Sequence, residues 1–98
     1  MKRMVRLREE ADQDLAVAAT WYEQQCSGLG QEFLDKGLST FQLIAEQPLM
    51  YPMVHRNIRR ALMSRFPFGI YFRIERSYIV VLAVMHASRD PIHWQSRT

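Results

Sequence analysis

Residues 68–86, FGIYFRIERSYIVVLAVMH, contain the pair of strands that determines the fold. Bulky apolar side chains alternate with small or polar ones along residues 68–75, which predicts a strand that buries one face and carries polar groups on the other. Residues 79–85 are apolar throughout, as is typical of an interior strand covered on both faces. Only Arg76 and Ser77 separate the two stretches. We therefore expect an antiparallel pair whose second strand, residues 78–86, is central in a sheet.

Two further strands are expected to join this pair. Residues 57–63 precede it across a turn at residues 64–67, which completes a three-stranded antiparallel meander. Residues 4–8 alternate Val5 and Leu7 with arginines, the pattern of a strand with one buried face. This N-terminal strand is expected to return beside the central strand and make the sheet mixed.

Two helices are expected between the first strand and the meander. Four carboxylates within residues 9–14 precede the first helix, which runs to about Gln25 and ends at the glycine turn of residues 28–30. The second helix covers residues 29–46 and stops before Pro48, where a loop of residues 48–52 begins. The predicted buried stripes are Ala11, Leu15, Ala18, Tyr22 and Cys26 on the first helix, and Phe33, Leu34, Leu38, Phe41, Ile44 and Ala45 on the second.

The expected architecture is one α+β domain over residues 1–98. It consists of an N-terminal strand, a two-helix hairpin and a three-stranded meander, which form a four-stranded sheet with the helices packed on one face. A chain of this length folds around one core, because typical domains contain about 100–150 residues. With 48% hydrophobic and 23% charged residues, the composition is that of a globular protein and not of a disordered chain.

The composition gives no indication of a membrane segment, a disulfide or a metal site. No apolar run reaches the roughly 18 residues that cross a bilayer. The basic start of the chain lacks the apolar stretch of a secretory signal, which predicts a cytoplasmic location. The single Cys26 has no cysteine to pair with and no metal-ligand spacing around it. We therefore expect no cofactor.

Charge is distributed unevenly along the chain, whose net charge is +3. Residues 1–54 carry five Lys or Arg against eight Asp or Glu, whereas residues 55–98 carry eight Arg and no Lys against two acids. Guanidinium groups are suited to binding phosphate or carboxylate through two parallel hydrogen bonds. The meander half is therefore predicted to contact an acidic partner. The alternative is that its arginines only keep the strand surface soluble.

Four groups of residues also carry a family resemblance. They are ADQDL and WYE (residues 11–15 and 21–23); GLGQEF (28–33); PLMYP, IRRAL and RFPFGIYFR (48–52, 58–62 and 65–73); and VMHASRDP (84–91) followed by Trp94 and Arg97. In this order, over nearly the whole chain, they resemble the ParE branch of the RelE/ParE toxin superfamily. The resemblance implies a plasmid-stabilisation type toxin of a type II toxin–antitoxin system.

The resemblance also implies a partner. Such a toxin is neutralised by a small antitoxin encoded beside it, whose disordered segment folds on binding. The basic meander half suits an acidic antitoxin. A homodimer and a heterotetramer with the antitoxin are both compatible with the sequence.

Two activities are open within this superfamily. RelE-like members cleave messenger RNA on the ribosome, and ParE-like members inhibit DNA gyrase by binding. Metal-free RNA cleavage needs an acid, a base and cations that stabilise the charged transition state. The catalytic candidates here are His86, because histidine is the side chain most often used as an acid or base near neutral pH, with Arg65, Arg73 and Tyr71. RelE-like enzymes typically place lysines or a glutamate beside their arginines, and this meander has no lysine, so the catalytic set looks incomplete.

A binding surface needs only exposed charge and aromatic groups. The candidates for contacting the target or the antitoxin are Arg59, Arg60, Arg65, Arg73, Arg89, Trp94 and Arg97. Strand alternation puts Tyr71 and Arg73 on one face, and Arg59 and Arg65 on one side if their strand stays extended, which makes a basic concave surface plausible.

Several of these residues also have a purely structural interpretation. His86 could bond a neighbouring backbone group or Asp90, and Trp94 could close the core edge beside an Arg89–Asp90 ion pair. Trp21 and Tyr22 are interpreted as packing residues. We therefore predict a non-enzymatic toxin that inhibits DNA gyrase by binding. Cleavage of ribosome-bound mRNA is the alternative, and an inactive interaction module is a third.

Overall fold

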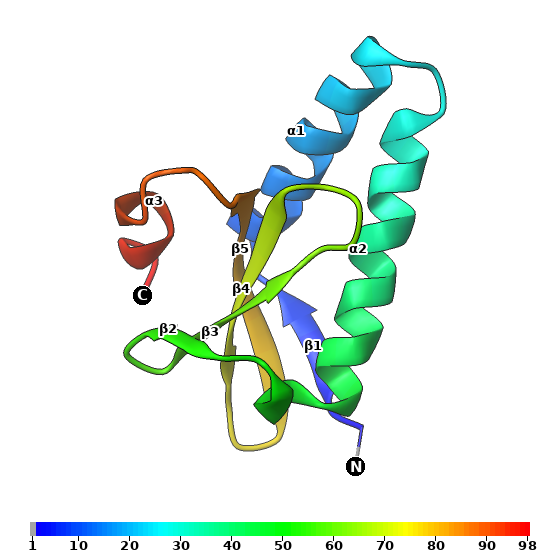
Figure 1. The fold of residues 1–98 in the computed structure, drawn as a ribbon. Coiled ribbons are helices and arrows are strands. Elements are labelled where there is room, and N and C mark those ends of the chain that lie inside the picture. The colour runs from blue at the N-terminus through cyan, green and yellow to red at the C-terminus, as the bar shows by residue number, and fades with distance from the viewer. Residues whose placement is uncertain (1) are drawn as a thin grey trace.

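The computed structural model describes residues 2–98 and shows one sheet with helices on both of its faces (Figure 1). The elements in chain order are β1 (Met4–Leu7), α1 (Glu9–Gln25), α2 (Leu29–Glu46), the 3-10 turn η1 (Pro48–Met50), β2 (Met53–His55), β3 (Ile58–Leu62), β4 (Phe68–Ile74), β5 (Tyr78–His86) and α3 (Ile92–Gln95). The predicted strand, helix hairpin and meander are confirmed in this order.

The sheet has the strand order β1-β5-β4-β3-β2. β1 runs parallel to β5, and the other neighbours are antiparallel, so β5 is an interior strand as predicted. The prediction of four strands is wrong, because β2 adds a fifth at the edge beyond β3. β2 has three residues and a register shift against β3, which is too short and too irregular to leave a period-two pattern.

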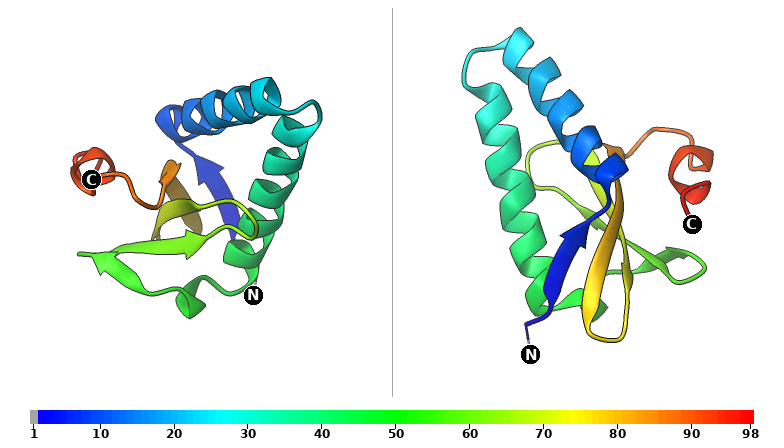
Figure 2. Two further views of the ribbon diagram at one scale, coloured as in Figure 1. Left: turned by 45° about the horizontal axis from the view of Figure 1, so that its top comes forward. Right: turned by 180° about the vertical axis from the view of Figure 1, so that it is seen from behind.

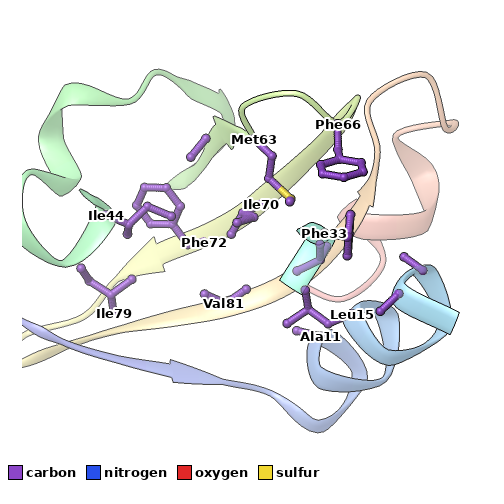
Figure 3. Packing of buried hydrophobic residues seen from close by; sticks show 14 residues of the cluster. Ala11, Leu15, Phe33, Ile44, Met63, Phe66, Ile70, Phe72, Ile79 and Val81 are labelled. Atoms are coloured by element: carbon purple, nitrogen blue, oxygen red, sulfur yellow. The ribbon is translucent and has the colours of Figure 1, made fainter. Parts of the chain in front are cut away.

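The helix hairpin covers one face of the sheet and α3 lies on the other (Figure 2). Between the hairpin and the sheet is the larger core, where side chains of α1 and α2 meet those of β4 and β5 (Figure 3). Ala11, Phe33 and Ile44 on the helices and Phe72 and Val81 on the strands are all completely buried there.

The predicted stripe of α2 is wrong at two positions, since Leu34 and Leu38 are exposed, and so is Cys26 after α1. The face that α2 buries includes Gly30, Phe33, Gly37 and Ile44. A Cβ atom added to Gly30 would lie 2.5 Å from the backbone oxygen of Ala19. The two helices approach each other through small residues, which turns the leucines of α2 outward.

The second face of the sheet is also partly buried, so the prediction of a polar face for β4 needs correction. Tyr71 is 1% exposed, and its ring stacks on that of Trp94 with 4.4 Å between centroids. Trp94 comes from α3, a four-residue helix that the sequence patterns did not indicate. Together with Ile58, Leu82 and other apolar side chains, these two rings form a second, smaller core.

None of the helices within residues 2–98 has the length and apolar character needed to cross a membrane.

Candidate partner-binding site

An apolar groove of about 530 Å³ lies between the outer side of α1 and the C-terminal end of β5. Val17 and Trp21 of α1 form one wall and are 70% and 55% exposed. They lie one helical turn apart, on the side of α1 that faces away from α2. Phe68 and Met85 contribute apolar surface from the sheet, so the groove offers an apolar contact surface to a partner.

An aromatic cluster supports the Trp21 wall from behind. The rings of Trp21 and Tyr22 meet edge to face with 5.1 Å between centroids, and Tyr22 in turn stacks on the buried Phe33 at 5.3 Å. Burial raises the pKa of the Tyr22 hydroxyl above its ordinary value. The interpretation of Tyr22 as a packing residue is confirmed. Trp21, in contrast, is mainly exposed, and only its spacing from Val17 on the outer helix face could have indicated this.

His86 and Arg89 form the polar rim of the groove. His86 is exposed at the end of β5, and its Nδ1 accepts a hydrogen bond from the Ser88 backbone N–H at 3.1 Å. Asp90 accepts a hydrogen bond from the Ile92 N–H at 3.0 Å, where α3 begins, and the hydrogen-bond partner of His86 is Ser88 instead. Arg89 has no ion-pair partner within residues 2–98, so its charge is free to meet one on another molecule.

Arg97 is bound internally, beside the floor of this groove. Its guanidinium donates to both carboxylate oxygens of Asp14, at 2.6 and 3.2 Å, and to the Leu82 carbonyl at 3.1 Å. Asp14 also accepts the backbone N–H of Val84 at 3.0 Å. β1 ends opposite Val81, so beyond that point this ion pair satisfies the open edge of β5 and fastens the C-terminal segment to α1.

The remaining candidate arginines do not form one cluster. Arg65 lies in the turn after β3 with a φ of 75°, and its side chain pairs with Glu32 of α2. Arg59 donates to the Tyr51 carbonyl at 2.6 Å, on the helix-bearing face. The Tyr51 hydroxyl has its pKa raised by burial. Both arginines lie on the helix-bearing side, but the strand does not stay extended between them as the expectation of a shared side required, because β3 ends at Leu62.

Arg60 and Arg73 lie on the opposite face, where the strand register places Arg60 beside Tyr71 and Arg73 beside Ile58. Arg73 is paired with Glu75, the residue that follows the end of β4. Tyr71 is covered by Trp94. His86, Arg65 and the pair Arg73 and Tyr71 thus come to three separate places: the groove rim, the α2 side and the second face of the sheet, where Trp94 covers Tyr71 and Glu75 pairs with Arg73. The one exposed surface where candidates meet is the groove rim formed by His86 and Arg89.

Residues 2–98 contain no group of three or more His, Cys, Asp or Glu residues placed to hold a metal ion.

Solved structures from two toxin–antitoxin systems have a similar fold. The chain superposes with a TM-score of 0.72 on a chain of the chromosomal ParDE TA system from P. aeruginosa, at 15% identity, covering 87% of this chain and 96% of that one. It superposes with a TM-score of 0.58 on a chain of the toxin–antitoxin complex RelBE2 from Mycobacterium tuberculosis, at 18% identity, covering 88% and 99%. No curated protein matches the chain.

The sequence of the chain matches a family model over most of its length. A model of the ParE toxin of the type II toxin–antitoxin system parDE matches residues 5–91. The match begins in β1, includes both helices and the whole sheet, and ends just before α3. The chain therefore belongs to the ParE toxin family of type II toxin–antitoxin systems.

Proposed function

We propose that this ParE-family toxin acts in the cytoplasm by binding its target, DNA gyrase, and that a cognate acidic antitoxin neutralises it. The observation that carries the proposal is that His86 and Arg65 lie apart from each other and from Arg73 and Tyr71, of which Arg73 is paired with Glu75 and Tyr71 is covered by Trp94. General acid–base cleavage of RNA requires its acid, base and cations within hydrogen-bond reach of one phosphate. Binding requires only an exposed complementary surface, such as the groove with Trp21 and Arg89.

The groove has the features of a binding site for another protein. It combines a large exposed aromatic side chain, apolar walls and an arginine at the rim, and Trp and Arg are enriched among the residues that dominate interface energies. The solved relatives named above come from a ParDE system and a RelBE2 complex, which supports an antitoxin partner.

One observation favours RNA cleavage as a second candidate function. His86 is exposed and lies in the same groove as Arg89, which gives a titratable group and a cation on one surface. These two residues alone supply an acid or base and one phosphate contact.

A pair of assays on the purified toxin distinguishes the two functions. We expect the toxin to block supercoiling by DNA gyrase and to leave ribosome-bound mRNA intact. Arg89→Glu should weaken inhibition of gyrase about tenfold or more, because it reverses the unpaired rim charge. Arg76→Glu, in the exposed β4–β5 turn, is the matched control and should inhibit normally.

Cleavage of mRNA that is lost in His86→Ala would overturn the binding proposal in favour of the nuclease. A toxin that is harmless when expressed alone, and inert in both assays, would leave an interaction module only.

A further inference from the structure

The outer side of α1 offers no free charge, although the exposed face of a helix usually carries its charged residues. The exposed residues along this side are Gln13, Ala16, Val17, Thr20, Trp21 and Gln24. The only charged residues between positions 13 and 25 are Asp14 and Glu23. Asp14 is paired with Arg97. Glu23 accepts hydrogen bonds from the glycine turn before α2, so both carboxylates are satisfied within the chain.

Two neighbouring rows of side chains on this side differ in size. Val17 and Trp21, one helical turn apart, form a row of large side chains, and Ala16 and Thr20 form a row of small ones beside it. A hollow of about 370 Å³ is lined by these four residues and Gln24, all of which belong to α1. Rows of residues four apart are the ridges and grooves through which helices pack. The outer side of α1 therefore presents a ridge next to a groove.

The row of small side chains can be buried without loss of a hydrogen bond. The Thr20 hydroxyl already donates to the Ala16 carbonyl at 2.8 Å, so contact with another surface leaves no unpaired hydroxyl there. Val17 and Trp21 are the large apolar side chains of α1 that are exposed, and their burial is favourable. Within residues 2–98 no other element covers this side of α1 (Figure 2). Any covering surface must come from another molecule.

A second copy of the chain fits this surface by its shape. A ridge beside a groove is complementary to itself: after a two-fold rotation, the ridge of each copy lies in the groove of the other. Helices that pack through rows of residues four apart cross at about 50°, the commonest class of helix contact. When α1 is crossed at its middle, the helix ends diverge. The acidic first turns, with Glu9, Glu10 and Asp12, then lie outside the contact.

Charge also favours a second copy over an acidic partner. A contact between identical surfaces can bring like charges together, which costs binding energy. The two rows of α1 carry no charge, so this cost does not arise. An acidic partner is attracted by cations, and no cation lines the hollow. Arg89 lines the other groove, at the end of β5, where an acidic partner was proposed.

We propose that two copies of the toxin pair through the outer side of α1, with Val17 and Trp21 of each copy packed on Ala16 and Thr20 of the other. Val17 and Trp21 also line the groove at the end of β5. Pairing therefore competes with the binding of a partner in that groove, and dilution or a partner releases the single toxin. The pairing is independent of the proposed function, whereas its competition with a partner rests on it.

The test is the mass of the purified toxin in sedimentation experiments from micromolar to near-millimolar concentration. We expect a reversible shift from one copy to two, with little dependence on salt because the contact contains no free charge. The fluorescence of Trp21 should move to shorter wavelength over the same range, because pairing removes water from its ring. Trp94 is already buried and should not contribute to this change.

Two hydroxyl residues on different helices provide a variant and its matched control. Thr20→Arg puts a cation from each copy into one contact and should weaken pairing about tenfold or more. Ser39→Arg is the control: Ser39 is exposed on α2, and its hydroxyl likewise donates to the carbonyl four residues earlier, at 3.0 Å. An equimolar mixture of Thr20→Arg and Thr20→Glu should pair again, because the opposite charges then meet in one contact.

The outcomes separate this proposal from the proposed function. A toxin that remains a single copy throughout the concentration range overturns the pairing and leaves inhibition of gyrase untouched. A dimer that Thr20→Arg does not weaken, or a mixture of the two variants that fails to pair, overturns α1 as the contact. If the toxin alone is a single copy and Thr20→Arg weakens its complex with the small protein encoded beside its gene, the outer side of α1 belongs to that protein and the proposed occupant is wrong.

Discussion

The pair formed by Asp14 and Arg97 shows how two residues far apart in the sequence complete the sheet. β5 continues past the end of β1, and its edge there would expose a carbonyl at Leu82 and an N–H at Val84. A carboxylate and a guanidinium complement these two groups and each other. The Arg97 carbonyl in turn accepts a hydrogen bond from the Arg8 side chain at 2.8 Å. Arg97 therefore has a structural task in addition to any contact with a partner.

The position of this pair predicts a stability difference between two arginines. The side chains of Arg97 and Asp14 are only 20% and 16% exposed, so Arg97→Met leaves a poorly solvated carboxylate without its cation. We expect a loss of about 1.5–3 kcal/mol in the free energy of unfolding, measured by urea titration. Arg65→Met is the control: Arg65 is 61% exposed in its pair with Glu32, so its loss should be within about 0.5 kcal/mol. Equal losses in the two variants would contradict the structural role of Arg97.

At the scale of elements, the helix hairpin is held together at its glycine turn. The Glu23 carboxylate accepts hydrogen bonds from the N–H groups of Gly28 and Gly30, at 2.9 and 3.0 Å, and thereby caps the start of α2. Gly28 has a φ of 88°, a conformation that glycine adopts without strain. The close approach of α2 to α1 follows directly, because Gly30 lies against the backbone of Ala19.

Two glycines of α2 are expected to respond in opposite ways to alanine. A Cβ at position 30 would meet the Ala19 oxygen at 2.5 Å, so Gly30→Ala should lower the free energy of unfolding by about 1–3 kcal/mol. A Cβ at position 37 would make ordinary contact with Leu15 at 3.5 Å. Gly37→Ala should therefore stabilise the protein by about 0.5–1 kcal/mol through helix propensity. Thermal unfolding of both variants checks this, and a stabilised Gly30→Ala would show that the helices can separate at no cost.

The same elements show how far the sequence predicts this molecule. Long segments with clear periodicity, such as β4, β5 and both main helices, are where the patterns indicated. The buried face of α2 could not be read from apolar spacing, because glycines form the contact and push Leu34 and Leu38 outward. β2 and α3 have too few residues to show a period. The site was predicted less well. The faces of the arginines were inferred from strand alternation, which does not apply to Arg65 because it lies in the turn after β3.

At the scale of the whole molecule, the sheet separates two cores of unequal size, and the two tryptophans belong to different environments. Trp94 on α3 seals the smaller core over Tyr71 and is 4% exposed. Trp21 on α1 is 55% exposed and lines the groove between α1 and the C-terminal end of β5. One ring is therefore expected to serve stability and the other to serve binding.

Alanine substitution of each tryptophan separates these two tasks. Trp94→Ala removes a buried aromatic ring and uncovers Tyr71, so we expect the free energy of unfolding to fall by about 3 kcal/mol or more. Trp21→Ala should change it by less than about 1 kcal/mol, because most of that ring is already in water. Binding should show the reverse order once both proteins are held at a temperature where they are folded: Trp21→Ala should lose affinity for the antitoxin or the target, and Trp94→Ala should retain it. If Trp21→Ala instead unfolds as readily as Trp94→Ala and binds normally, the groove beside α1 is a packing defect of the free chain and the partner-binding surface lies elsewhere.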